Sequence, residues 1–260
     1  MLLSAYKTAN QVGLLESPLA EAIFRRSYFA YKALIEDPFA RLIKHQPALF
    51  HGGNILDVGA NIGYTAALFA RAVAPPYRVH AFEPEQRNFR WLEHTIARAA
   101  LGDRVVAHRA AVGAKEGTID LWYNAAHHAD HRIATSAQQS GGEQLQRVPM
   151  TTVDHWVTSA GAAPVAFIKI DVQGFEPEVL RGMRATLAGN PSCHVAVEFS
   201  PGALTDLGFD PAAFLADLAS ALPRMAILDH DGRLRDAAPA AILAETARGR
   251  GYLDLVCAAA

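Results

Sequence analysis

Residues 54–65, with the sequence NILDVGANIGYT, leave the chain few ways to fold. The apolar run Ile55–Val58 leads through a turn that contains Gly59 and Gly63 directly into a helical pattern. A strand followed at once by a glycine turn and a helix is the start of a βαβ unit. Because the first N–H groups of the helix then lie at the carboxyl end of the strand, we expect a ligand site at this turn.

The same alternation continues along most of the chain. From residue 54 on, short apolar runs alternate with amphipathic stretches, which predicts an α/β fold with a doubly wound, mostly parallel sheet. The expected strands cover residues 55–58, 78–82, 105–111, 118–123, 147–153, 165–170, 193–199, 225–228 and 252–257. The expected helices cover residues 64–73, 85–100, 177–187 and 211–222. The pattern does not specify the order of the strands in the sheet.

Composition excludes several classes of protein. Lys and Arg number 24 against 26 Asp and Glu, so no global positive charge attracts a phosphate backbone, and a nucleic-acid partner is not expected. No apolar run approaches the roughly 18 to 20 residues of a membrane span, and the N-terminus lacks the apolar block of a signal peptide. We therefore expect a cytoplasmic protein. Cys193 and Cys257 have no metal-type spacing and are predicted to be buried free thiols.

Two acidic residues at strand ends indicate the kind of ligand. The turn does not follow the G-x-G-x-x-G pattern of dinucleotide sites, and Asp57 would place a negative charge beside a pyrophosphate. A ligand that carries an amino group fits this position better. Glu83 follows the strand that ends at Phe82, where a carboxylate can accept hydrogen bonds from two ribose hydroxyls.

With these features the chain resembles class I S-adenosylmethionine-dependent methyltransferases and, more narrowly, the FkbM family. The resemblance covers roughly residues 50–200 and rests on residues 56–65 (LDVGANIGYT), 81–84 (AFEP), 152–154 (TVD), 168–176 (IKIDVQGFE) and 179–182 (VLRG). Gln173 stands where the family usually has Glu. The resemblance implies a Rossmann-like fold and the transfer of a methyl group from S-adenosyl-L-methionine to a hydroxyl, commonly on a sugar, glycan or secondary metabolite.

The resemblance also assigns cofactor contacts. The turn from Gly59 to Gly63 would face the methionine part, Asp57 would hold its ammonium directly or through water, and Glu83 would hold the ribose. Ala111 and Val112 would lie by the adenine. The full set of expected cofactor-binding residues is Asp57, Gly59, Asn61, Gly63, Glu83, Pro84, Ala111, Val112 and Asp171.

The expected catalytic groups follow strands that end at the same edge of the sheet. Asp171 is the first candidate for orienting the acceptor or taking its proton, and Glu198, at the end of the next strand, is the second. Glu176 is interpreted instead as part of a turn and a helix N-terminus.

A histidine-rich loop admits three interpretations. The polar stretch 124–146 contains His127, His128, Asp130 and His131. It is an exposed loop or substrate lid, it supplies a general base, for which His128 is the candidate, or it binds a divalent metal. Because consecutive loop histidines lack a fixed ligand spacing, no metal is expected.

Residues 1–50 are expected to form a helical appendage of one domain that spans residues 51–260. Apolar residues recur at helical spacing between Ser17-Pro18 and Asp37-Pro38. The aromatic stripe of Phe24, Tyr28, Phe29 and Tyr31 is interpreted as core packing, as a homodimer contact or as a lid over the acceptor.

Two other functions stay open at this point. A nicotinamide-dependent oxidoreductase is disfavoured because G-x-G-x-x-G is missing and because Asp57 ends the first strand. A methyltransferase-like binding protein that has lost its chemistry is the other alternative.

Overall fold

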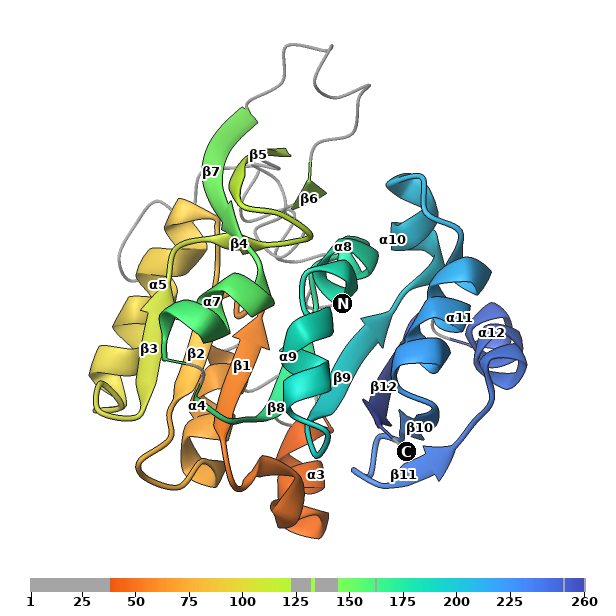
Figure 1. The fold of residues 1–260 in the computed structure, drawn as a ribbon, viewed down its shortest axis with the longest axis horizontal. Coiled ribbons are helices and arrows are strands. Elements are labelled where there is room, and N and C mark those ends of the chain that lie inside the picture. Colours follow the sequence, from red (N-terminus) through yellow and green to blue (C-terminus); the bar gives the residue numbers. More distant parts are fainter. Residues whose placement is uncertain (1–37, 123–131, 134–144, 162, 250, 260) are drawn as a thin grey trace, which may run out of the picture.

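The computed structural model describes residues 38–122, 132–133, 145–161, 163–249 and 251–259. The centre of this part is an eight-stranded sheet in the order β11-β10-β12-β9-β8-β1-β2-β3 (Figure 1). Its strands are β1 (Asn54–Val58), β2 (Val79–Phe82), β3 (Val105–His108), β8 (Val165–Ile170), β9 (His194–Phe199), β10 (Arg224–Leu228), β11 (Leu234–Asp236) and β12 (Leu253–Ala258).

The strands from β9 to β3 pair in parallel, whereas β12 runs antiparallel to both of its neighbours and β11 antiparallel to β10. The prediction of a doubly wound, mostly parallel sheet is therefore confirmed. The chain proceeds from β1 outward to β3 and then crosses to β8 and β9 on the other side of β1. The strand order thus reverses between β1 and β8, and ligands of open α/β sheets bind outside the carboxyl ends of the strands at such a reversal.

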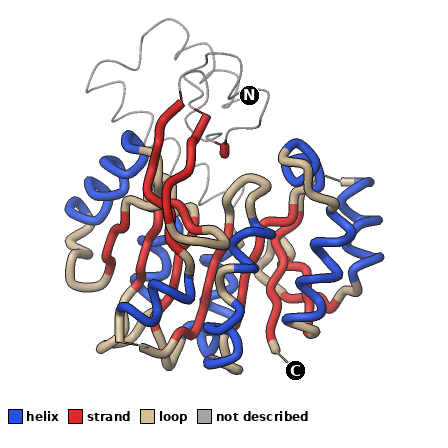
Figure 2. The backbone as a smooth tube through the Cα atoms, turned by 45° about the horizontal axis from the view of Figure 1, so that its top comes forward, coloured by secondary structure: helices blue, strands red, loops and turns tan. Residues whose placement is uncertain are grey.

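Helices cover both faces of the large sheet (Figures 1 and 2). One face packs against α3 (Phe39–His45), the 3-10 helix η3 (Pro47–Phe50), α4 (Tyr64–Ala72) and α5 (Gln86–Arg98). The other packs against α7 (Val153–Ser159), α8 (Glu176–Arg181), α9 (Arg184–Gly189), α10 (Pro201–Asp206), α11 (Pro211–Ala221) and α12 (Pro239–Arg248). β1 and β8 are buried along their whole length, which explains their nearly continuous apolar sequences. None of the described helices is long and apolar enough to cross a membrane.

Residues 39–50 pack into the core of the sheet domain. Phe50 is fully buried, and its ring centroid lies 4.5 Å from that of Phe167 on β8 and 5.7 Å from that of Phe69 on α4. The end of the expected N-terminal appendage is therefore part of the sheet's packing, and the division at residue 50 stays a prediction. The helix expected between residues 17 and 37 and its aromatic stripe lie outside the described residues.

A second, smaller sheet lies beyond the carboxyl edge of the large one. It contains β4 (Ala111–Val112), β7 (Leu145–Thr151), β5 (Gly117–Trp122) and β6 (Arg132–Ile133), in that order. Figure 2 shows β5 and β7 rising past this edge. Its buried side chains, which include Val148 and Met150, pack against Phe175 in the loop that follows β8. The small sheet is therefore in contact with the loop that carries Asp171.

Three expected elements were wrong in their extent. The strand expected at 105–111 is two strands in different sheets, β3 and β4, because the chain turns at Ala110, whose N–H donates to the carbonyl of His108. The strand expected at 147–153 ends at Thr151, since Thr152 caps α7 by accepting from the N–H of His155. The helix expected at 177–187 is divided at Gly182, which lies so close to the chain at Gly113 that a Cβ would overlap its carbonyl.

Five described elements were not predicted. They are β6, α7, α10, β11 and α12. Each is short or rich in small residues, as in the sequence PAAILAETAR of α12, so its apolar periodicity is weak. Tertiary packing decides the structure of such segments.

Candidate active site

The glycine turn after β1 brings two parts of the chain into close contact. Gly59 has a φ of +82°, and a Cβ there would overlap the carbonyl oxygen of Asp171. Gly63 has a φ of +87° and leads into α4, and a Cβ there would come within 2.7 Å of a methyl carbon of Leu92. Gly59 is needed so that the chain leaving β1 can lie against the chain leaving β8.

The N–H groups of this turn are largely used inside the protein. The backbone donors are Gly59 and Ala60 to the carbonyl of Phe82, Gly63 to the carbonyl of Ala60, and Asn61 to the carboxylate of Glu83. Asn61 has a φ of +49°, a conformation that Asn tolerates better than most residues. Its contribution to Glu83 comes from the backbone.

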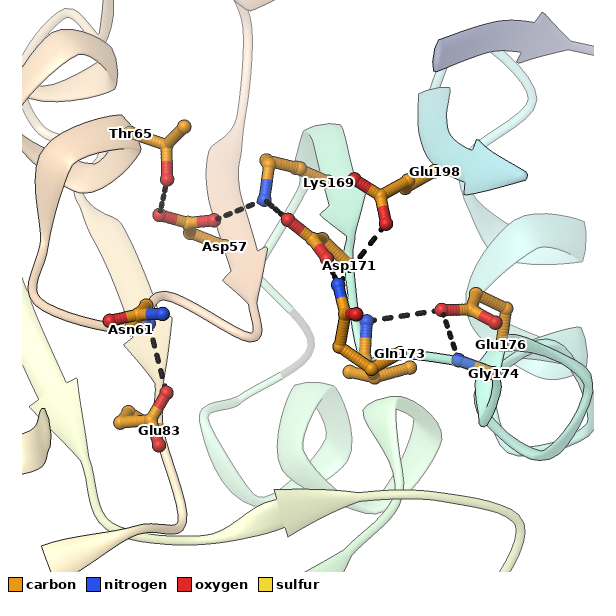
Figure 3. Close-up of polar contacts among 11 residues, drawn as sticks. Asp57, Asn61, Thr65, Glu83, Lys169, Asp171, Gln173, Gly174, Glu176 and Glu198 are labelled. Carbon is orange, nitrogen blue, oxygen red and sulfur yellow. Dashed lines mark hydrogen bonds and ion pairs between the residues drawn. The ribbon is translucent and has the colours of Figure 1, made fainter. Parts of the chain in front are cut away.

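Glu83 is a buried acceptor at the end of β2. One carboxylate oxygen accepts from the N–H of Asn61 and the other from the N–H of Glu85, both at 2.9 Å (Figure 3 shows the first). The residue is only 6% exposed, and burial raises the pKa of its carboxyl to about 8. Because a carboxylate oxygen can accept two hydrogen bonds, a diol can donate to both oxygens and stabilise the charged form.

Asp57 is completely buried and connects β1 with α4 and β8. Its Oδ2 accepts a 2.6 Å hydrogen bond from the hydroxyl of Thr65, and its Oδ1 lies 3.8 Å from the ammonium of Lys169. Burial raises the pKa of Asp57, while Lys169 and Thr65 act in the opposite direction. Its contact with a cofactor ammonium stays a prediction, and from this buried position the contact would be indirect.

Lys169 lies between two carboxylates. The strand register places it beside Asp57 on β1, and Asp171 follows two residues later, so both carboxylates share its face of the sheet. The ammonium of Lys169 is 3.2 Å from Oδ2 of Asp171 and 3.8 Å from Oδ1 of Asp57. Lys169 is 6% exposed, so its positive charge balances carboxylates that would be costly to bury alone.

Gln173 connects the ends of β8 and β9. Its side-chain nitrogen donates to Oδ1 of Asp171 at 2.9 Å and to Oε1 of Glu198 at 3.1 Å (Figure 3). Asp254 on β12 lies directly opposite Glu198 in the strand register. The two expected catalytic carboxylates are thus brought together, with Lys169 on one side and Gln173 between them.

Glu176 turns inward, away from this edge. Its Oε1 accepts from the N–H groups of Val172 and Gly174, both at 3.1 Å, and the residue is 2% exposed. Burial raises the pKa of its carboxyl to about 7. This agrees with its interpretation as part of a turn and a helix start.

The remaining expected site residues lie next to Glu83, in the small sheet, or outside the described residues. Pro84 follows Glu83 and is partly buried, while Ala111 and Val112 are buried in β4 against Met150 and Thr151 of β7. His128 and its neighbours His127, Asp130 and His131 lie outside the described residues. The described part of the chain contains no group of three or more His, Cys, Asp or Glu residues arranged to hold a metal ion.

The sequence analysis assigned no role to Lys169 or Gln173. The sequence did contain an indication that Lys169 has a polar partner, because it is the one charged residue in the apolar strand VAFIKI. Gln173 was noted only as a departure from the family motif. Its position between two carboxylates depends on β9 lying next to β8, which the periodicity of the chain does not reveal.

The family model described as the methyltransferase FkbM domain matches residues 57–222. No curated protein sequence matched the chain.

Two solved structures are similar in fold. The methyltransferase FkbM from Methylobacillus flagellatus has a TM-score of 0.52 and 18% identity, over 88% of this chain and 50% of that one, so this chain spans about half its length. The O-methyltransferase TomG from Streptomyces achromogenes, solved with S-adenosylmethionine, has a TM-score of 0.51 and 15% identity, over 100% of this chain and 90% of that one. At these identities the similarity shows the fold.

Proposed function

Because the chain belongs to the FkbM methyltransferase family, we propose that it transfers a methyl group from S-adenosylmethionine to a hydroxyl on a sugar, glycan or secondary metabolite. One observation carries the proposal. At the reversal between β1 and β8, the glycine turn lies between the buried carboxylate of Glu83 and the bridged pair of Asp171 and Glu198. The side of the turn next to Glu83 suits a ribose, and the side next to Asp171 and Glu198 suits the methyl group and its acceptor.

The residues present fit this cofactor. Glu83 has a buried carboxylate held by two N–H donors at the strand end where a ribose diol is recognised. Asp171 and Asp57 provide negative charge near the glycine turn, which suits a ligand with an ammonium and a sulfonium. When bound, S-adenosylmethionine supplies a methyl group on a positively charged sulfur.

The same turn is poorly suited to a pyrophosphate, which argues against the oxidoreductase alternative. The N–H groups of Gly59, Ala60 and Gly63 are used inside the protein, and Asn61 donates to Glu83. Anion sites of this type depend on backbone donors that point at the ligand.

Asp171 is the group we assign to the acceptor hydroxyl. With S-adenosylmethionine bound, the Asp171 carboxylate would orient the acceptor hydroxyl toward the methyl group and take the hydroxyl proton as the methyl group is transferred. Lys169 and Gln173 each donate to one oxygen of Asp171, which holds the carboxylate in one orientation. Glu198 contributes through Gln173.

The remaining expectations belong to the same proposal. The near balance of 24 basic and 26 acidic residues supports a small-molecule or glycan acceptor and speaks against nucleic acid. We also place the enzyme in the cytoplasm and assign any homodimer contact to the helices expected from the sequence at the N-terminus.

A transfer assay tests the function. Wild-type protein with methyl-labelled S-adenosylmethionine and a panel of sugar, glycan and phenolic acceptors should give labelled product, and a calorimetric titration should detect S-adenosylmethionine but not NAD. Binding of NAD in place of S-adenosylmethionine would refute the proposal.

Asp171→Asn is the first variant to measure. Asn keeps the shape but removes the charge, so turnover should fall by about 10²- to 10⁴-fold while the affinity for S-adenosylmethionine changes far less. Asp103→Asn, in the exposed turn before β3, is the matched control. Wild-type turnover in Asp171→Asn would remove this residue from the mechanism, and loss of the fold would make it structural.

A further inference from the structure

We propose that Gln173 is a positioning residue whose amide bridges Asp171 and Glu198 and keeps both carboxylates charged and aligned at the reacting edge. The inference rests on the proposed function, because it takes Asp171 as the group that receives the acceptor's proton. It concerns a position where the family motif usually has Glu, so the motif itself does not supply this role.

The chemistry of the bridge is specific to an uncharged amide. The nitrogen of Gln173 has two hydrogens, and the structure uses one for Asp171, at 2.9 Å, and one for Glu198, at 3.1 Å. An ionised Glu at this position has no hydrogen to donate, and a protonated Glu has one. Only the amide can donate to both carboxylates without adding charge.

The charges around Gln173 explain why an uncharged side chain stabilises the two carboxylates better than a charged one. Charged groups face this part of the site from the strands around it: Asp57 from β1, Lys169 and Asp171 from β8, Glu198 from β9 and Asp254 from β12. Glu176 of α8 points inward, but its buried carboxyl still interacts electrostatically with Asp171. Within the described residues, carboxyl groups here outnumber ammonium groups. A further carboxylate would favour uptake of a proton by the cluster, because like charges at short range raise one another's pKa values.

The backbone gives independent support. Gln173 has a φ of +55°, a left-handed conformation that costs a non-glycine residue roughly 1 to 2 kcal/mol. The loop is held there by Glu176, whose Oε1 binds the N–H groups of Val172 and Gly174. Glycine at position 173 would be less strained in this loop. The side chain of Gln173 therefore has a role that offsets the strain.

Gln173→Gly removes the side chain but suits the backbone conformation, so it distinguishes the role of the amide from the cost of the positive φ. Glycine accepts the same φ, so the midpoint of thermal unfolding should stay the same or rise. The two carboxylates lose their bridge, and kcat should fall by about 10- to 100-fold, as expected for misaligned reacting groups, while the affinity for S-adenosylmethionine changes by less than about threefold.

Gln173→Glu tests the charge. A third carboxyl between Asp171 and Glu198 should make the cluster hold a proton, so the acidic limb of the kcat against pH profile should move upward by about one unit or more. Gln46→Glu, on the exposed end of α3, adds the same charge far from this edge and should leave the profile in place. A purely structural defect would lower kcat at every pH and would not move the limb.

Two outcomes would overturn the inference: wild-type kcat in Gln173→Gly, or an unmoved acidic limb in Gln173→Glu. A clear loss of thermal stability in Gln173→Gly would also overturn it, since the residue would then support the fold. Each of these results leaves methyl transfer by the wild-type protein intact. Failure of the proposed function is seen separately, as the absence of transfer from the wild-type protein to any acceptor.

Discussion

Single residues at the carboxyl edge of the large sheet have pKa values that differ from those of the same side chains in water. Glu83 is the clearest case, because burial raises the pKa of its carboxyl to about 8 from an ordinary value of 4.5. A carboxyl whose pKa is higher in the folded state contributes stability that is complete below about pH 4.5 and is lost as the pH rises through about 8. Near neutral pH the Glu83 carboxyl is therefore mainly protonated, and a ribose diol that donates to both of its oxygens would favour the ionised form.

The affinity for S-adenosylhomocysteine should consequently rise with pH up to about 8 and then level off. Ribose hydroxyls donate to the ionised form, so binding near pH 7 releases a proton, and each pH unit below the pKa weakens binding by up to about tenfold. Calorimetry in two buffers of different ionisation enthalpy measures the affinity and the proton release together. Glu83→Ala should bind more weakly by about 1 to 3 kcal/mol and lose this pH dependence. A flat profile for the wild-type protein would contradict the ribose assignment.

At the scale of elements, strand register and close chain contacts build the site. β8 lies beside β1 with Lys169 next to Asp57, and the chain leaving β8 lies against Gly59 so closely that a side chain cannot fit between them. The N–H of Asp171 donates to the carbonyl of Val58 at 3.0 Å, which extends the pairing of the two strands to Asp171. The contact at Gly59 therefore positions Asp171.

Gly59→Ala should destabilise the protein by about 2 to 5 kcal/mol, the combined cost of a positive φ and of the overlap with Asp171. Gly52→Ala is the matched control, because Gly52 has a φ of +90° but an added Cβ would meet nothing within 4 Å. That variant should lose only about 1 to 2 kcal/mol. Urea unfolding measures both, and equal losses would show that the close approach is unimportant.

At the scale of the whole molecule, one packed core joins residues 39–50 to the centre of the large sheet. Phe50, Phe69 and Phe167 come from η3, α4 and β8, and their ring centroids are all within 5.7 Å of one another. The candidate site lies at the opposite, carboxyl end of β8, so one strand connects this aromatic packing with the segment that carries Asp171.

Phe50→Ala should therefore lower the free energy of unfolding by about 3 to 5 kcal/mol, because a fully buried aromatic ring is replaced by a cavity beside the central strand. Unfolding should stay a single transition by fluorescence and circular dichroism. Leu145→Ala, at a side chain of β7 that is 38% exposed, should change stability by less than about 1 kcal/mol. A separate early transition in Phe50→Ala would indicate that residues 39–50 unfold independently of the sheet.

Local pattern was enough to predict the elements that carry the site. The apolar runs of β1, β2 and β8 are long enough to be recognised. Asp57 is the last residue but one of β1, and Glu83 and Asp171 directly follow β2 and β8 in the sequence. The glycine turn could be located because its spacing is local, and a ligand site there stays a prediction. Weakly periodic segments such as α12, and the break between β3 and β4, were missed because packing against distant residues decides them.

What the sequence alone determined is thus a set of strands with acidic residues at their ends and a family resemblance. The tertiary structure decided which strands are neighbours. β8 pairs with β1, and β9 with β8, so Lys169 lies beside Asp57 and Gln173 lies between Asp171 and Glu198. Period-two and helical patterns report which face of an element is buried, but strand order and register come from contacts between residues far apart in the chain. The bridged carboxylates are therefore a property of the folded sheet.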